Sequence, residues 1–446
     1  MFNESIKRQG DSFVDIFSLG LISKSIFENT ESHRDSLAVK TITFQVTEDC
    51  SLKCSYCYEI NKSKKSMSFE TAKKFIDMLI EDSYKEDSYV YIGDTKAVIL
   101  EFIGGEPLLE VDLIHEIMDY FIYKTTTEKH PWAINYMISM ISNGVHYFEN
   151  RVQELFEKYQ GRLSFSMSLD GNKELHDACR VFPNGAGSYD IVEKACLHYM
   201  KHHNPMMGTK LTVAPENIDY MFVAFKNLLN LGYKVIHANP IYEENWSLDY
   251  AKKYYAQLKQ IGDYILENDL EKDIYISLFN SNQFTPMSPT DNQNYCGSTG
   301  SMLSLDCNGG IYPCIRFMSI SLGDSVEPYK IGDIETGIGR KPKYKYKIDL
   351  LNSVTRKSQS TEKCFNCPIA TGCGHCTAYN YQVNKTPNKK LDYICNMHKA
   401  RSLANAYYFN KLYLKHKKED RFKIYLDEKD VLDIIEKDEY TMLLNL

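Results

Sequence analysis

Short apolar runs alternate with longer amphipathic stretches along the first half of the chain. Six of these runs have the length and composition of strands, and they cover residues 41–46, 97–103, 136–142, 163–169, 207–213 and 233–239. Between the first two, apolar residues from Phe69 to Ile80 recur at helical spacing, and Ser68 is suited to cap that helix. Repeated strand–helix units favour a parallel sheet with right-handed crossovers. The pattern therefore predicts an α/β fold, a partial (β/α)6 TIM-like barrel, with chemistry at the carboxyl ends of its strands.

The pattern changes after residue 240. Residues 248–267 predict one long helix, and residues 300–313 predict a hairpin whose turn runs from Cys307 to Gly310. Residues 322–362 are polar and irregular, and we interpret their basic run at 340–347 as a solvated loop rather than a substrate-contacting patch. Residues 401–446 are charged and helical in pattern. This half predicts a small α+β unit followed by a helical tail.

The composition bounds the function. Of the 446 residues, 43% are hydrophobic and 25% charged, which excludes disorder as a description of the whole chain. A net charge of −7 argues against nucleic-acid partners and against binding to an anionic membrane surface. The first twenty residues are interrupted by charges and no run reaches the length of a membrane span, so we expect a cytoplasmic protein. In that reducing compartment, 13 cysteines indicate metal or cluster ligands rather than disulfides.

Ten of the cysteines fall into two groups. The first is Cys50-x3-Cys54-x2-Cys57, and the second comprises Cys296, Cys314, Cys364, Cys367, Cys373, Cys376 and Cys395. A structural zinc site needs four ligands, whereas a [4Fe–4S] cluster held by three cysteines leaves one iron open to another ligand. The three-cysteine group favours the open cluster. A zinc site with a distant fourth ligand, in a scaffold without catalysis, stays the non-enzyme alternative.

The first group resembles the signature of radical S-adenosylmethionine (SAM) enzymes, and Tyr56 supplies the aromatic residue before its last cysteine. Further motifs follow predicted strands in the order of that family: Gly104-Gly105-Glu106-Pro107, Ser142-Asn143-Gly144, and Ser168-Leu169-Asp170-Gly171 with Arg180 after it. The second group resembles the SPASM domain, a seven-cysteine extension of peptide-modifying radical SAM enzymes. Cys373-x2-Cys376 departs from its usual spacing by one residue. Together the two resemblances cover residues 41–400.

The resemblance implies three [4Fe–4S] clusters and SAM as cofactors. Cys50, Cys54 and Cys57 would hold the cluster that binds SAM, from which a 5′-deoxyadenosyl radical forms. Auxiliary cluster I would use Cys296, Cys314 and Cys376, with Cys307 as the candidate fourth ligand or the position left open to a substrate thiolate. Auxiliary cluster II would use Cys364, Cys367, Cys373 and Cys395. The implied SAM contacts are Tyr56, Gly104, Gly105, Glu106, Asn143, Ser168, Asp170 and Arg180.

The resemblance also implies a division of the chain and a reaction. The division is an N-terminal segment (1–40), a radical SAM partial barrel (41–240), a helical bridge (241–295), a SPASM domain (296–400) and a helical tail (401–446). We expect maturation of a ribosomally made precursor peptide by a thioether from a cysteine, as in sactipeptide and ranthipeptide synthases. Carbon–carbon crosslinking of the cyclophane type, or another peptide oxidation, is the competing reaction.

Two further expectations concern the reaction and its partners. Formylglycine formation, as in anaerobic sulfatase maturation, is disfavoured because Ile315 stands where that family carries an aspartate base. The expected partners are the precursor peptide and a reductant of the flavodoxin or ferredoxin type. The N-terminal segment is too short for a winged-helix leader-binding domain, which leaves leader recognition to a separate protein or to this segment.

Overall fold

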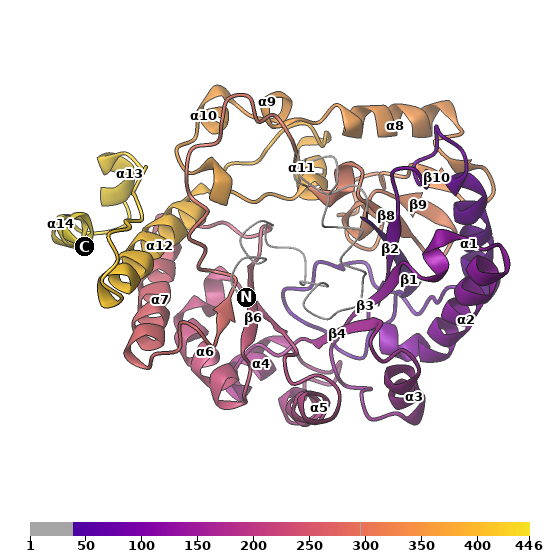
Figure 1. Cartoon of the computed structure of the whole chain (residues 1–446), viewed down its shortest axis with the longest axis horizontal. Helices are drawn as coiled ribbons and strands as arrows, with labels where there is room; N and C mark the ends of the chain where they lie inside the picture. Colours follow the sequence, from indigo (N-terminus) through magenta and orange to yellow (C-terminus); the bar gives the residue numbers. More distant parts are fainter. Residues whose placement is uncertain (1–38, 295) are drawn as a thin grey trace.

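One mixed sheet organises the molecule (Figure 1). The structure is a computed structural model, and it describes residues 39–294 and 296–446. The strand order is β11-β10-β9-β8-β1-β2-β3-β4-β5-β6-β7, and every pairing from β8 to β7 is parallel. The strands are β1 (Val39–Thr47), β2 (Ala97–Gly104), β3 (Tyr136–Ser142), β4 (Leu163–Met167), β5 (Thr209–Val213), β6 (Val235–Pro240), β7 (Tyr275–Ile276), β8 (Met302–Leu305), β9 (Gly310–Tyr312), β10 (Gly332–Asp333) and β11 (Gly337–Ile338). The six predicted strands are β1 to β6, so the α/β prediction is confirmed.

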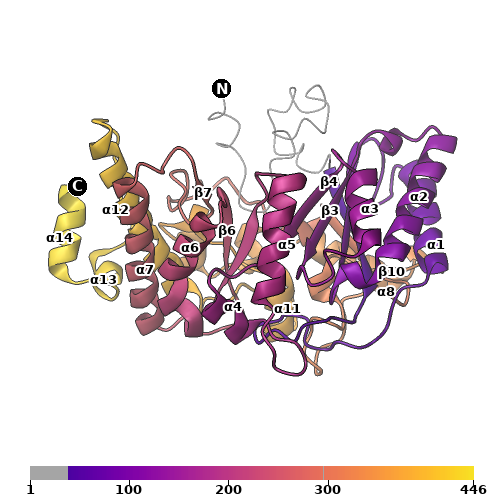
Figure 2. The same cartoon turned by 90° about the horizontal axis from the view of Figure 1, so that it is seen from below.

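Helices cover the outer side of the strand arc (Figures 1 and 2). They are α1 (Phe69–Ser83), α2 (Val111–Thr127), α3 (Asn150–Lys158), α4 (Lys173–Cys179), α5 (Tyr189–His202), α6 (Met221–Asn230) and α7 (Leu248–Glu267). The predicted cap of α1 is confirmed, because the Ser68 hydroxyl accepts the Thr71 N–H at 3.1 Å. The long helix predicted at 248–267 is α7.

The two faces of the sheet differ in chemistry because successive residues of a strand point to opposite sides. On the helix side, Phe44 of β1 stacks on Phe102 of β2 at 5.6 Å and meets Phe75 of α1 edge-on at 5.5 Å. On the inner side, Thr43 lies in register with Glu101, and Glu101 with Ser139 of β3. The hydrophobic core therefore lies between the sheet and the helices, and the concave side of the sheet carries polar side chains.

The second half of the chain joins the same sheet rather than standing apart. The predicted hairpin is confirmed as antiparallel β8 and β9, and β8 also pairs in parallel with β1 through Thr41 and Met302. The remaining helices are α8 (Pro342–Asn352), α9 (Arg356–Gln359), α10 (Glu362–Phe365), α11 (Thr377–Asn384), α12 (Cys395–Lys415), α13 (Glu428–Leu432) and α14 (Lys437–Asn445). The pairing of β8 with β1 places the second cysteine group beside the first strand of the barrel.

Two details of the predicted organisation change. The loop expected at 340–347 is wrong, because helix α8 begins at Pro342, where a fixed φ and a missing N–H suit the first helical position. The expected division at 400/401 falls inside α12, which packs along α7. The N-terminal segment lies outside the described residues up to position 38. Within residues 39–294 and 296–446, no helix is long and apolar enough to cross a membrane.

Candidate active site

The first cysteine loop leaves the carboxyl end of β1 and is held in place by Gly105 and Glu106 at the end of β2. Gly105 N donates to Thr47 O at 3.1 Å, and the next residue, Glu106, donates its N–H to Asp49 O at 2.8 Å. A Cβ added at Gly105 would lie 2.2 Å from Asp49 O and 2.9 Å from Cys50 Cβ. Glycine is required here because the end of β2 touches the backbone of the cysteine loop. The Gly-Gly-Glu motif thus sets the position of Cys50.

Glu106 ties the ends of two strands together. Its carboxylate accepts the Ser142 hydroxyl at 2.7 Å, the Asn143 N–H at 2.7 Å and the Leu108 N–H at 3.1 Å. Burial raises the pKa of Glu106, and these hydrogen bonds oppose that rise. Asn143 then reaches back to the cysteine loop, where its Nδ2 donates to Ser51 Oγ at 3.0 Å. The structure therefore brings the predicted residues of β2 and β3 together beneath the first cysteine group.

The three thiols of this loop share one electrostatic environment. Burial raises the pKa of Cys50 to about 12 and also raises that of Cys54, and charge on neighbouring loop cysteines adds to both rises. Lys62 opposes both rises, and its Nζ donates to Cys57 Sγ at 3.1 Å. Thiols bind iron as thiolates, so a nearby ammonium favours the ligating form. Lys62 is a site residue that the motifs did not indicate.

Asp170, Arg180 and Tyr56 form one buried network. Arg180 Nε donates to an Asp170 carboxylate oxygen at 2.7 Å, Tyr56 Oη donates to the same oxygen, and Thr212 N donates to the other at 3.0 Å. Burial would raise the pKa of Asp170, but the Arg180 charge and its hydrogen bond outweigh burial and lower it. The Arg180 guanidinium also lies over the Tyr56 ring, 5.3 Å from its centroid. In this arrangement the Asp170 carboxylate fixes Arg180.

A set of three thiols forms in the second half of the chain. Burial raises the pKa of Cys314 well above its ordinary value, and charge on Cys296 and Cys376 raises it further, which puts the three in electrostatic range of one another. Cys307 lies elsewhere: its Sγ donates to Gln45 O at 3.1 Å. After burial, the largest effects on the pKa of Cys307 come from the Glu48 and Asp306 carboxylates, which raise it, and from the Lys65 ammonium, which lowers it.

The four thiols of the last group influence one another electrostatically. Burial raises the pKa of Cys395 to about 12, and charge on Cys373, Cys364 and Cys367 adds to the rise. Cys373 differs from the rest, because its pKa falls to about 6. Burial alone would raise it, but the His398 imidazole and the Lys390 ammonium outweigh burial, and Lys390 Nζ donates to Cys373 Sγ at 3.2 Å.

The thiols are arranged as neighbours and not as the tight shell of a single ion. In the part of the chain that the structure describes, no three His, Cys, Asp or Glu side chains converge closely enough to hold one metal ion. A cluster with several irons holds its thiolates further apart than a single ion does. Among the described residues, the thiol sets therefore do not form the ligand shell of a single metal ion.

Arg316 connects these regions. Its guanidinium lies 4.5 Å from the centroid of the Tyr58 ring, next to Cys57 in sequence, and it pairs with Glu243 in the loop after β6. It also lowers the pKa of Cys376, against the larger effect of burial. The sequence alone showed only that Arg316 follows the second cysteine of its group by two positions.

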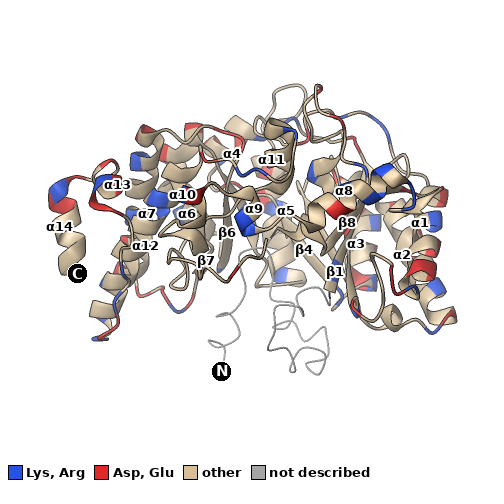
Figure 3. Ribbon diagram, turned by 90° about the horizontal axis from the view of Figure 1, so that it is seen from above, with Lys and Arg blue, Asp and Glu red and all other residues tan. Residues whose placement is uncertain are grey.

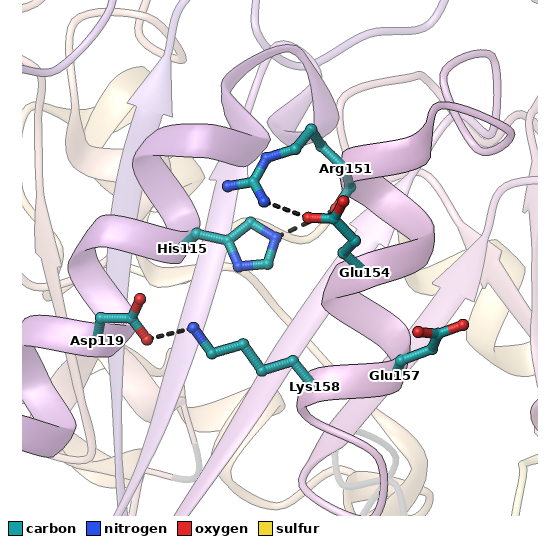
Figure 4. Close-up of a pocket in the computed structure, with 6 residues that line it drawn as sticks. All are labelled: His115, Asp119, Arg151, Glu154, Glu157 and Lys158. Atoms are coloured by element: carbon teal, nitrogen blue, oxygen red, sulfur yellow. Dashed lines mark hydrogen bonds and ion pairs between the residues drawn. The ribbon is translucent and has the colours of Figure 1, made fainter.

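A surface pocket lies far from this chemistry, between α2 and α3 on the outer side of the sheet (Figure 4). Its walls are ion pairs and hydrogen bonds between the two helices, such as His115 Nε2 with Arg151 O at 3.1 Å. The pocket contains none of the residues that the motifs indicated, and we assign it no role. The lining residues are His115, Asp119, Arg151, Glu154, Glu157 and Lys158.

Comparison with known proteins places this geometry in a family. Residues 39–164 match the family model described as a 4Fe-4S single cluster domain. An uncharacterized protein of Methanocaldococcus jannaschii is 28% identical over 298 residues, covering 66% of this chain and 91% of the relative. The radical SAM cyclopropyl synthase TigE of Paramaledivibacter caminithermalis is 22% identical over 358 residues, covering 76% of this chain and 67% of the relative. The chain is thus similar to a radical SAM enzyme over most of its length.

Other radical SAM relatives match over a similar length. A cysteine-type anaerobic sulfatase-maturating enzyme of Clostridium novyi is 25% identical over 372 residues, covering 77% of this chain and 87% of the relative. The solved structure of native anSMEcpe with bound AdoMet and Cp18Cys peptide superposes with a TM-score of 0.61 at 17% identity, covering 85% of this chain and 99% of that chain. At that identity the structural likeness is one of fold. The family match itself indicates an iron–sulfur cluster site within residues 39–164.

Proposed function

We propose that this protein is a radical SAM enzyme that matures a ribosomally made peptide by forming a thioether from a peptide cysteine. Its named relatives modify peptides or proteins, and one fold relative was solved with a cysteine peptide bound. The observation that carries the thioether is the three-thiol set of Cys296, Cys314 and Cys376, from which Cys307 is displaced to a backbone carbonyl. Three protein thiolates leave room for a fourth thiolate on a cluster. A substrate cysteine is the ligand with matching chemistry.

The proposal assigns the cysteines to three clusters. Cys50, Cys54 and Cys57 hold the cluster that binds SAM, and this cofactor pair supplies a carbon radical able to take hydrogen from an unactivated C–H bond. Cys296, Cys314 and Cys376 hold auxiliary cluster I with an open position. Cys364, Cys367, Cys373 and Cys395 hold auxiliary cluster II. The segment from 296 onward then serves as a SPASM domain, within the division into domains expected from the motifs.

The chain's own residues act by positioning. The Gly104–Glu106 segment and Asn143 fix the first cysteine loop, and the network around Arg180 holds a cation at the carboxyl ends of the strands. In the proposal these groups receive SAM, with Ser168 on the neighbouring strand end. Overall, SAM would be the oxidant: the carbon-bound hydrogen would leave in 5′-deoxyadenosine with release of methionine, and the sulfur-bound hydrogen would leave as a proton. One C–S bond would form, and the remaining electron would return to the iron–sulfur centres. A reductant of the flavodoxin or ferredoxin type supplies the electron, and leader recognition belongs to a separate protein or to the N-terminal segment.

Mass spectrometry tests the proposal. The anaerobically reconstituted enzyme is incubated with SAM, dithionite and short cysteine-containing peptides encoded beside it. A product lighter by two hydrogens, whose cysteine resists alkylation, supports the thioether. A product equally lighter whose cysteine is alkylated supports carbon–carbon crosslinking, which the TigE relationship keeps as the second candidate. The Cys50→Ala/Cys54→Ala/Cys57→Ala variant should release no 5′-deoxyadenosine, and release at the native rate would reject this cluster assignment.

A matched cysteine pair tests the open position. Cys314→Ala should abolish the change that a cysteine peptide causes in the electron paramagnetic resonance (EPR) spectrum of the auxiliary clusters. Cys307→Ala should leave that change intact, because its thiol serves a backbone carbonyl. A peptide with serine in place of cysteine should cause no change in either protein. Equal effects of the serine and cysteine peptides would refute thiolate binding.

A further inference from the structure

A lysine without a partner lies on the inner side of the sheet. Lys210 of β5 stands in register with His237 of β6, and its neighbours Thr209 and Leu211 are buried on the opposite side. Among residues 39–294 and 296–446, no side chain or carbonyl hydrogen-bonds or ion-pairs with the Lys210 ammonium. Lysine is almost never held inside a protein without a partner. The position therefore calls for an explanation.

The other cations near Lys210 are already neutralised. Arg180 is bound by Asp170 at 2.7 Å, and Arg316 is paired with Glu243. On the outer helices, Lys and Arg are interspersed with Asp and Glu (Figure 3), and many of them form ion pairs, such as Lys253 with Asp219 at 2.6 Å. Lys210 is thus an interior cation that differs from the paired cations around it.

Glu101, an inner-side carboxylate that acts on Lys210, has its own hydrogen-bond partner. Glu101 of β2 accepts the Thr43 hydroxyl at 2.7 Å, and burial raises the pKa of Glu101, which favours its neutral form. Burial lowers the pKa of Lys210, and the charges of Arg180 and Arg316 lower it further, while Glu101 and Asp170 act in the opposite direction. A second carboxylate inside the barrel would stabilise the charged lysine through a charge-assisted hydrogen bond.

We propose that Lys210 binds a carboxylate of the peptide substrate inside the barrel, supplied by an acidic side chain. This inference rests on the proposed function, because it places the peptide on the concave side of the sheet. It adds a substrate class: a peptide with Asp or Glu near the residue that reacts. The same carboxylate chemistry is carried by a peptide C-terminus and by the methionine part of SAM, and the experiment separates these sources.

Binding of defined tripeptides to the reconstituted enzyme in the presence of SAM tests the proposal. The probes are Ac-Ala-Glu-Ala-NH2, Ac-Ala-Gln-Ala-NH2 and Ac-Ala-Gln-Ala-OH, and dissociation constants are measured by calorimetry. We expect the Glu probe to bind about tenfold tighter than the amidated Gln probe, which is about 1.4 kcal/mol. Lys210→Gln should remove this preference and Lys210→Arg should keep it. Lys226→Gln is the matched control, because Lys226 lies over the Phe222 and Tyr264 rings on the helix side.

Each outcome of the binding experiment either supports or overturns the proposal. A preference for the Glu probe that depends on Lys210 supports the proposal. A Lys210-dependent preference for the probe with a free C-terminus alone would overturn the side-chain assignment. Loss of SAM affinity in Lys210→Gln with the peptide preference unchanged would assign Lys210 to SAM and overturn the proposal, as would equal binding of all probes by the native enzyme. If the thioether assay fails, the dissociation constants of the tripeptides can still be interpreted. The two proposals can therefore be rejected independently.

Discussion

Replacing Gly105 by alanine tests the link between the end of β2 and the first cysteine loop. The added Cβ would stand 2.2 Å from Asp49 O and 2.5 Å from Asp49 C, where ordinary contacts begin at 3.4 Å. Both atoms belong to backbone, so the loop must move by roughly 1 Å rather than a side chain rotating away. The movement strains the hydrogen bonds to Asp49 O and Thr47 O, each worth about 1 kcal/mol.

The displaced atoms lead directly into Cys50, so the expected result is loss of one cluster. We expect iron content to fall from about twelve to about eight atoms per chain, because a [4Fe–4S] cluster carries four irons. Reductive cleavage of SAM should fall below detection. The circular dichroism spectrum should be retained, because the hydrophobic core lies on the other side of the strands.

The assay is iron and sulfide analysis with anaerobic SAM cleavage. Gly323→Ala is the matched control, since the nearest atom to its added Cβ is Gln382 Nε2 at 3.9 Å. A Gly105→Ala enzyme with full iron content and native SAM cleavage would refute the reasoning. Equal loss in the Gly323→Ala enzyme would show that any glycine replacement disturbs cluster assembly.

Three further predictions follow from the same contacts. Cys307→Ala should keep the full iron content, measured after reconstitution, whereas loss of about four irons would make Cys307 a ligand. Lys390→Met should lower the midpoint potential of auxiliary cluster II in EPR titration, because its N–H bond to Cys373 favours the more negative reduced state, and Lys390→Arg should lower it less. Burial lowers the pKa of His176 from 6.5 to about 4. As pH falls from 6.5 to 4, His176 therefore binds a proton in the unfolded chain but not in the native protein. The free energy of unfolding, from urea titration, should therefore drop by about 2 kcal/mol between pH 7 and pH 5, and His176→Gln should flatten that slope.

Local pattern predicted much of the fold. Strands β1 to β6, helix α7 and the β8–β9 hairpin arise where apolar spacing and turn residues agree with the final structure. The loop predicted at 340–347 is wrong because helix α8 begins at Pro342. The alternating lysine and tyrosine side chains of this run do not show an apolar helical pattern. The joining of β8 to β1 could not be predicted, because backbone pairing between distant strands carries no sequence motif.

The site likewise combines residues that the sequence predicted with contacts that only the structure showed. The first cysteine group, the run from Cys364 to Cys376 and the Gly-Gly-Glu motif could be recognised in the sequence because each lies within one short segment, where spacing alone limits the geometry. The residues that contact those motifs could not be predicted from the sequence. The contacts of Lys62 with Cys57, of Lys390 with Cys373 and of Arg316 with Tyr58 depend on the tertiary arrangement of loops, which no motif encodes.

The sequence by itself predicted the grouping of the cysteines, and it predicted a cluster with an open iron as the chemistry of the first group. Only the tertiary structure decided where Cys307 lies and which charged side chains lie on the concave side of the sheet. Cys307 is bound to the carbonyl of Gln45, 262 positions away, and Lys210 points to the concave side because β5 is parallel to its neighbours at a fixed register. Ligand spacing is a property of short chain segments, whereas the fate of a single thiol or ammonium depends on packing between segments that are distant in sequence.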